Sequence, residues 1–184
     1  MRLPYTDNPP NVSNTEDEQI LERVLKRRRG SLIALDRTLL HAPKITDGFN
    51  AFMIALRTQN SLPADVRETA FCRVAAITGC WYEWEIHSQI AGDAGVSQRG
   101  LQSIRNRDSI DTTGLESRQA AVLKYADAIT RTAFVPSEIF NSVRQFFNEK
   151  EMVELTASIA GFNTVARFCV ALDVGENNDQ GQES

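Results

Sequence analysis

A short stretch, Gly79–His87, places several side chains that could do chemistry close together in the sequence. It contains a thiol at Cys80, a carboxylate at Glu83 and an imidazole at His87. Residues three or four apart share one face of an α-helix, so these three groups lie together with Trp84 on an otherwise apolar stripe. A charged group on such a stripe is costly unless it is paired or serves chemistry. The spacing therefore predicts polar groups that point into a core or a pocket.

Proton transfer is the chemistry that best fits these side chains. The imidazole of His87 titrates near neutral pH and could act as a general acid or base. Glu83, one turn earlier, could orient His87 or move a proton itself; the alternative is a structural ion pair with an arginine of the last helix. Cys80 could be a nucleophile, although a small buried side chain is the more ordinary role. Trp84 could line the pocket or fill the core.

Composition limits the classes of function. The chain has 184 residues, of which 42% are hydrophobic and 24% charged, with a net charge of −4. These values indicate one globular domain and argue against nucleic acid or a membrane as the partner. Three widely spaced cysteines favour a reducing compartment, and hence a cytoplasmic location. We find no leader segment, no apolar run long enough to cross a bilayer and no metal-binding motif, and we expect no cofactor.

Periodicity and capping residues predict an all-α protein. Residues 1–14, rich in Pro and Asn, predict an extended arm; residues 15–174 predict a single helical domain; and residues 175–184 predict a disordered polar tail. The expected helices cover about 15–30, 32–40, 47–59, 63–79, 80–94, 97–104, 116–133, 136–147 and 149–172. The helices 63–79 and 80–94 would form a central hairpin, and the charged stripe lies on its second helix.

Residues 35–174 resemble the carboxymuconolactone decarboxylase and alkylhydroperoxidase D (AhpD) superfamily. The family signature is a Glu on one helix, followed by Cys-x-x-Cys-x-x-x-His at the start of the next. Glu68 stands at the family spacing, twelve residues before Cys80, and His87 takes the histidine position. Glu83 replaces the second cysteine. The resemblance implies an AhpD-like helical fold and a role for Glu68 beside the hairpin residues.

Further residues extend this resemblance. Tyr82 and Trp84 belong to a Tyr-Glu-Trp-x-x-His pattern that is similar to family members without the cysteine pair. Asn163 and Arg167 resemble the final helix of that branch. We therefore expect all four to bind substrate, with Arg167 holding a carboxylate through paired hydrogen bonds. The alternative for Arg167 is a salt bridge to one of the two glutamates.

Peroxide reduction in this family needs an attacking and a resolving cysteine, and Cys80 has no partner at Glu83. The resemblance therefore implies a decarboxylase-like enzyme, a lyase or isomerase that uses acid–base groups on a small organic acid, lactone or ring compound. Two alternatives stay open: a thiol-dependent alkylhydroperoxidase-type antioxidant enzyme and a non-catalytic helical assembly protein. Family members of this kind assemble symmetrically, and we expect a homodimer, trimer or hexamer.

Overall fold

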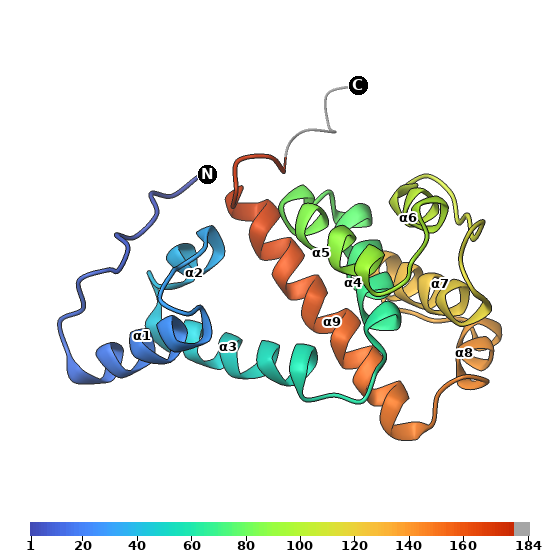
Figure 1. The fold of residues 1–184 in the computed structure, drawn as a ribbon, viewed down its shortest axis with the longest axis horizontal. Helices are drawn as coiled ribbons and strands as arrows, with labels where there is room; N and C mark the ends of the chain where they lie inside the picture. Colours follow the sequence, from blue (N-terminus) through green and yellow to red (C-terminus); the bar gives the residue numbers. More distant parts are fainter. Residues whose placement is uncertain (179–184) are drawn as a thin grey trace.

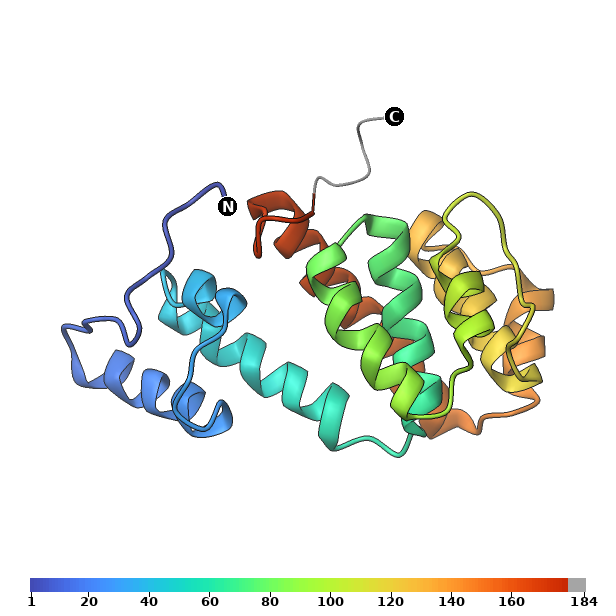
Figure 2. The same cartoon turned by 45° about the horizontal axis from the view of Figure 1, so that its top comes forward.

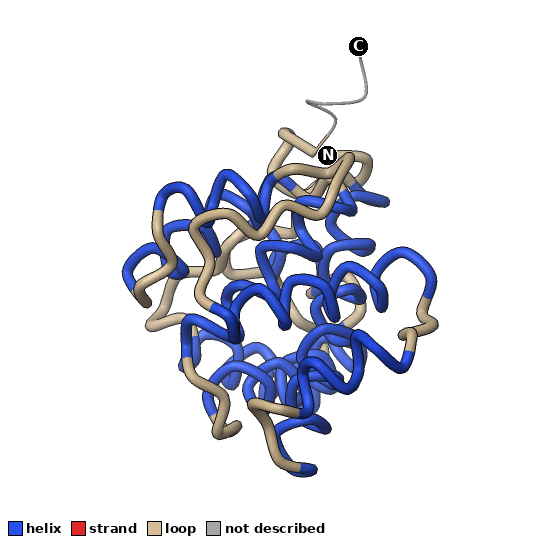
Figure 3. Tube along the Cα trace, turned by 90° about the vertical axis from the view of Figure 1, so that its right-hand side faces the viewer, coloured by secondary structure: helices blue, strands red, loops and turns tan. Residues whose placement is uncertain are grey.

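Helices alone form the regular structure of the part of the chain that the computed structural model describes, residues 1–178 (Figures 1 and 3). The all-α prediction is confirmed. The helices are α1 (Thr15–Arg27), α2 (Ala34–Leu39), α3 (Pro43–Thr58), α4 (Ala64–Thr78), α5 (Trp81–Asp93), α6 (Gln98–Arg105), α7 (Ser117–Thr132), α8 (Ser137–Arg144) and α9 (Glu149–Leu172).

The hairpin of α4 and α5 has the position that the sequence predicts. Pro63 precedes α4 as its N-cap, and Gly79 ends the helix in a left-handed conformation with φ of 71°. Glycine adopts this conformation without the steric strain of a Cβ atom, so the chain can reverse within two residues. Cys80 is then the N-cap of α5. The short turn sets the two helices side by side (Figure 2).

Helix α4 is the centre of the core. It packs against α5, α7 and α9, and most of its residues are fully buried. Arg73 on α4 has no exposed surface, and its guanidinium pairs with the carboxylate of Asp127 on α7. It also donates to the backbone carbonyls of Ile104 and Asn106. This satisfied buried charge fixes α7 and the loop after α6 against the hairpin.

Helix α9 crosses the molecule beside the hairpin and packs on α3, α4 and α7 (Figure 1). Within residues 1–178 it is the one helix long and apolar enough to cross a membrane by length and composition alone. The prediction that no apolar run is long enough to cross a bilayer was therefore wrong by this criterion. The buried residues Leu155, Ile159, Phe162 and Ala166 account for much of its apolar character, because they lie in the protein core.

The N-terminal helices reach the core through α3, since α1 and α2 both pack on that helix. Helix α1 begins at Thr15, as predicted, and the Asn14 side chain caps it by accepting a hydrogen bond from the backbone N–H of Asp17. The start of α3 differs from the prediction. Pro43 begins α3 four residues before the predicted start at Asp47, because proline is well suited to the first helical position, where no N–H is needed.

The two ends of the described chain meet at the end of α9. Residues 1–14 contain no helix, and the N-terminal amine of Met1 lies 2.7 Å from Asp173 Oδ2. Residues 175–178 pack on the protein: the Gly175 N–H donates to the Tyr5 hydroxyl, and Asn178 is 2% exposed. Of the predicted disordered tail, residues 179–184 lie outside the described residues.

Candidate active site

His87 is held by a carboxylate that arrives from the neighbouring helix. Its Nδ1 atom lies 2.5 Å from Glu68 Oε2, and both side chains are buried. A carboxylate accepts hydrogen bonds, so the proton of this pair lies on Nδ1. The Glu68 Oε1 atom accepts from Arg67 Nε at 3.2 Å. Glu68 thus fixes the tautomer and the orientation of the imidazole, in the position that the family spacing predicts.

Aromatic rings hold the imidazole from the other sides. The rings of Phe71 and Phe162 stack at a centroid distance of 4.2 Å, and His87 meets both edge-on at 5.2 and 4.9 Å. Such edge-to-face contacts are favourable and restrict ring rotation. The His87 side chain is therefore preorganised by packing as well as by hydrogen bonding.

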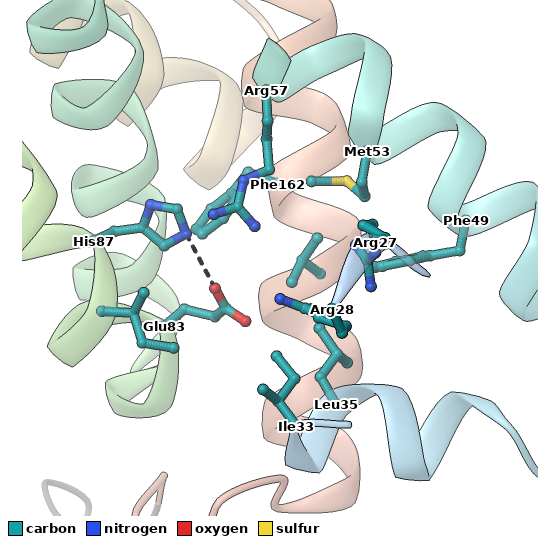
Figure 4. Close-up of a pocket in the computed structure, with 12 residues that line it drawn as sticks. Arg27, Arg28, Ile33, Leu35, Phe49, Met53, Arg57, Glu83, His87 and Phe162 are labelled. Atoms are coloured by element: carbon teal, nitrogen blue, oxygen red, sulfur yellow. Dashed lines mark ion pairs between the residues drawn. The ribbon is translucent and has the colours of Figure 1, made fainter. Parts of the chain in front are cut away.

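The second ring nitrogen of His87 faces Glu83. Nε2 lies 3.3 Å from Glu83 Oε2, with a geometry too poor for a hydrogen bond, and it is buried without a hydrogen-bond partner in residues 1–178 (Figure 4). Glu83 is 4% exposed. A buried polar atom without a hydrogen-bond partner is unfavourable unless a ligand or water forms a hydrogen bond with it. The arrangement leaves Nε2 and the Glu83 carboxylate available to a bound molecule.

The charge state of His87 follows from these contacts. Burial lowers the pKa of His87, but the hydrogen bond to Glu68 and the negative charges of Glu68 and Glu83 raise it by more, so its pKa lies above the ordinary value of 6.5. The raised pKa favours the imidazolium form, which can donate the Nε2 proton to a reacting atom. The carboxylate beside it can take one. The pair therefore has the components of a general acid and a general base.

A small cavity of about 50 Å³ lies in front of these two groups. Glu83, Ile86 and His87 of α5 form one wall, and Phe162 and Val165 of α9 form another. The N-terminal helices and the adjoining loop close the remaining side with residues Arg27, Arg28, Ile33, Leu35, Phe49, Met53 and Arg57 (Figure 4). The cavity is thus mostly apolar, with acid–base groups on one side and guanidinium groups on the other.

Cys80 does not line this cavity. The residue is fully buried at the start of α5, beside the thiol of Cys169 on α9. The hydrogen bond with Cys80 raises the pKa of Cys169, and burial and the Glu83 charge raise it further. A thiol that keeps its proton is a poor nucleophile. Cys80 is therefore not part of the cavity wall that contains His87 and Glu83.

The predicted substrate contacts from α5 also lie elsewhere. Trp84 packs edge-on against Trp81 at 6.3 Å, and Arg105 of α6 lies over both rings. Tyr82 lies against Gly175, and its backbone N–H donates to Asn178. Neither residue lines the cavity. The helical stripe is broad, and α4 and α6 cover different parts of it, so sharing a face with His87 does not place a residue in the cavity.

Asn163 and Arg167 face α7 instead of the cavity. Asn163 Nδ2 donates to Thr130 Oγ1 at 3.1 Å, and an Arg167 Nη atom donates to the Thr130 carbonyl at 3.0 Å. Neither residue lines the cavity, and within residues 1–178 Arg167 forms no salt bridge to a glutamate. Helical geometry is the reason, because positions 163 and 167 lie about 100° and 140° around the helix from Phe162.

Sequence reasoning missed the arginines of the cavity. Arg27 and Arg28 look like ordinary basic residues at a helix end, where they interact favourably with the helix dipole. Their partner is Asp36 of α2, which is 1% exposed and forms an ion pair with each of the two arginines. Asp36 could have indicated this cluster from the sequence, because it is an acidic residue between Leu35 and Leu39 in a short predicted helix and would need a basic partner if buried.

Comparison with known proteins finds a family model that matches part of the chain. Residues 43–128 match the model of the carboxymuconolactone decarboxylase family, and this segment contains Glu68, Glu83 and His87. The chain is also similar to the protein YdfG of Bacillus subtilis (strain 168), with 24% identity over 114 residues, which cover 62% of this chain and 78% of that protein.

Solved structures share the fold. One is an alkylhydroperoxidase AhpD core, a peroxidase-related protein from Ralstonia eutropha JMP134, with a TM-score of 0.76, 20% identity and coverage of 97% of this chain and 94% of that one. Another is the debrominase Bmp8, with a TM-score of 0.68, 18% identity and coverage of 89% and 88%. At these identities the likeness establishes the AhpD-like fold, as the sequence predicts.

Proposed function

We propose, since residues 43–128 match the model of the carboxymuconolactone decarboxylase family, that the chain is a cofactor-free enzyme that performs acid–base chemistry on a small organic acid, lactone or related ring compound. The reaction is a decarboxylation, an isomerisation or another proton-transfer step. The family also includes proteins with other chemistries, so the proposal depends on the residues of this particular site.

One observation carries the proposal. The Nε2 atom of His87 is buried without a hydrogen-bond partner in residues 1–178, and it lies 3.3 Å from Glu83 at the wall of a cavity. A group that only holds helices together would be expected to satisfy both ring nitrogens. Here one nitrogen is fixed by Glu68 and the other is open to a ligand.

The roles of the three residues follow from this geometry. Glu68 positions His87 and stabilises its charged form. The imidazolium donates the Nε2 proton to a substrate carbon or oxygen, and the Glu83 carboxylate accepts a proton from the same substrate. In a decarboxylation, the carbon that loses carbon dioxide takes the proton from His87. In an isomerisation, one group removes a proton and the other returns one elsewhere.

Thiol chemistry is the alternative that the peroxidase-related relatives suggest. The second cysteine position of the family holds Glu83, and Cys80 has no exposed surface. Cys169 is the nearest thiol, and its pKa is raised by the contact with Cys80 and by burial. These observations favour acid–base chemistry over attack by a thiolate on a peroxide.

A substrate screen followed by one substitution tests the proposal. Small lactones and organic acids are incubated with the protein, and mass spectrometry detects loss of carbon dioxide or rearrangement. His87→Asn keeps a donor near Glu68 but removes the Nε2 group. We expect it to reduce kcat by about 10²–10⁴-fold, the usual contribution of a general acid or base. His41→Asn, which changes the exposed histidine bonded to the Pro4 carbonyl, is the matched control.

An equal turnover of His87→Asn and the wild-type protein would contradict this assignment. So would a turnover that depends on added thiol and disappears in Cys80→Ala while His87→Asn retains it. In either case the acid–base role of the cavity would be abandoned.

A further inference from the structure

Three arginine side chains converge on the cavity from two different helical segments. Arg27 and Arg28 come from the end of α1, and Arg57 comes from the last turn of α3. Figure 4 shows Arg28 directed toward the side of the cavity that holds Glu83, and Arg57 between His87 and Met53. The three groups therefore face the acid–base pair across the cavity.

The negative charges nearby do not balance these arginines. Asp36 lies 2.6 Å from an Nη atom of Arg27 and 2.6 Å from Nε of Arg28, which accounts for both of its oxygens. Arg57 forms no ion pair with any residue in the described range 1–178, although its side chain is half-buried. Glu83 at the cavity and Asp36 behind the arginines supply two negative charges against three guanidinium groups, and the charges of His87 and Glu68 offset each other, so one positive charge remains in excess.

The excess positive charge contributes to a lowered pKa of Arg27. Burial lowers the pKa of Arg27, the charge of Arg28 lowers it further, and that of Arg57 acts in the same direction, while Asp36 opposes them. Like charges at short range in a half-buried site destabilise one another. A bound anion with a single charge would relieve this repulsion.

The space on both sides of the arginines suits such a ligand. A second cavity of about 230 Å³ shares Arg27, Arg28, Met53 and Arg57 with the inner one. The arginines thus form the boundary between a small inner cavity at His87 and a larger outer one. A guanidinium presents parallel N–H donors that match the two oxygens of a carboxylate or phosphate.

We propose that Arg57, together with Arg27 and Arg28, forms a binding site for the oxyanion group of a small apolar molecule. The apolar body lies against Phe49, Met53 and Phe162, and the reacting end reaches His87 and Glu83. Asp36 is a positioning residue, because it holds Arg27 and Arg28 in place without facing the ligand. The inference deepens the proposed function by assigning the anion-binding side of the same site, and it rests on that function only for the orientation of the ligand.

Binding of simple probes tests the site without turnover. The probes are benzoate, phenyl phosphate and the neutral analogue benzamide, measured by titration calorimetry. We expect at least one anion to bind and benzamide to bind more weakly. Arg57→Gln should weaken anion binding by about 10- to 100-fold, the effect of losing a charge-assisted hydrogen bond. Its melting temperature should stay close to that of the wild-type protein, since Arg57 has no ion pair in residues 1–178 to lose.

Arg105→Gln is the matched control, because this exposed arginine of α6 does not line either cavity. It should leave anion affinity unchanged. Arg57→Lys should restore part of the affinity, since it keeps the charge but loses the fork of donors. Preference for benzoate or for phenyl phosphate identifies which oxyanion the site takes.

Three results would overturn the inference: benzamide binding as tightly as the anions, Arg57→Gln binding them as tightly as the wild-type protein, or neither anion binding at all. The outcome is separable from that of the proposed function. His87→Asn should lose turnover yet keep anion binding within a few fold, so retained binding with normal turnover would refute the acid–base role alone.

Discussion

Glu68 and His87 are 19 residues apart in sequence, yet Glu68 Oε2 and His87 Nδ1 are 2.5 Å apart in the core. The pair spans the two helices of the central hairpin, and both residues are buried. Its geometry determines the tautomer of His87, and its electrostatics raise the pKa of the imidazole. The stability of the fold and the chemistry of the site therefore depend on the same ionisation.

The first prediction concerns the dependence of stability on pH. Because the pKa of His87 is raised in the folded protein, protonation stabilises the fold fully below the unfolded pKa of about 6.5. This stabilisation is lost as the pH rises through the folded pKa. We expect the free energy of unfolding to fall across that range in the wild-type protein. In Glu68→Gln, which removes the main partner that raises the pKa, the fall should be smaller or shifted to lower pH.

Chemical denaturation at a series of pH values measures this effect. Glu85→Gln serves as the control, since Glu85 is exposed on α5 and bonds only to Asn177 among the described residues. Parallel pH profiles for the wild-type protein and Glu68→Gln would show that the His87 ionisation is not coupled to folding.

The hairpin and the closeness of Glu83 to His87 could be predicted from the sequence because both depend on local rules. Gly79 marks the turn, and the spacing of four between Glu83 and His87 puts them on one face of a helix. The position of Glu68 came from the family resemblance, since its distance from His87 is a matter of helix packing. Local rules thus predicted the residues of α5 that share a face, and the family resemblance predicted that Glu68 of α4 lies beside them.

The other side of the cavity could not be read from the sequence. Arg28 and Arg57 are on different helices and meet only because α1 packs on α3. The direction of Arg167 away from the cavity was also not predictable, because α9 carries apolar residues on several faces and no single stripe shows which face is toward the site. Long-range packing decided both cases.

The second prediction concerns the thiols. Cys80→Ala should retain most of the turnover, because Cys80 is fully buried and does not line the cavity. It should lower the stability of the protein by about 1 kcal/mol, typical of a small buried deletion. Steady-state kinetics and thermal unfolding measure the two effects, with Cys169→Ala as the companion variant. Complete loss of turnover in a folded Cys80→Ala protein would make this thiol the nucleophile.

The third prediction concerns self-association, which we propose from the exposed apolar residues of α8 and α9. A groove of about 540 Å³ lies between these helices, with Phe140, Met152 and Val153 in its lining. Val153 is 69% exposed and Phe140 is 41% exposed. Contiguous apolar surface of this kind often marks an interface. We expect the wild-type protein to form a dimer, trimer or hexamer.

Val153→Glu places a charge in the groove and should shift the protein toward the monomer in light scattering at micromolar concentration. Lys124→Glu, an exposed charge change on α7, should not. A monomeric wild-type protein would refute the expectation, and an unchanged mass for Val153→Glu would move the interface to another surface.

The last prediction separates the acid from the base. Glu83 is 4% exposed, and its carboxylate faces the unpartnered Nε2 of His87 at 3.3 Å. Glu83→Gln keeps the shape of the side chain but cannot accept a proton. We expect kcat to fall by about 10²–10⁴-fold if the carboxylate is the base. The pKa of His87 should also fall, because one of the two charges that raise it is removed.

Thermal unfolding distinguishes this role from a purely structural one. Loss of a structural carboxylate would lower activity only as far as it lowers the fraction of folded protein, whereas loss of the base should lower kcat while the melting temperature stays close to that of the wild-type protein. In the pH profile of kcat, loss of the Glu83 charge should move the limb that reflects His87 ionisation to lower pH, since the imidazolium gives up its proton more readily. Glu85→Gln on the same helix should change neither kcat nor the limb. A Glu83→Gln enzyme with wild-type kcat and an unshifted limb would place the base elsewhere in the cavity.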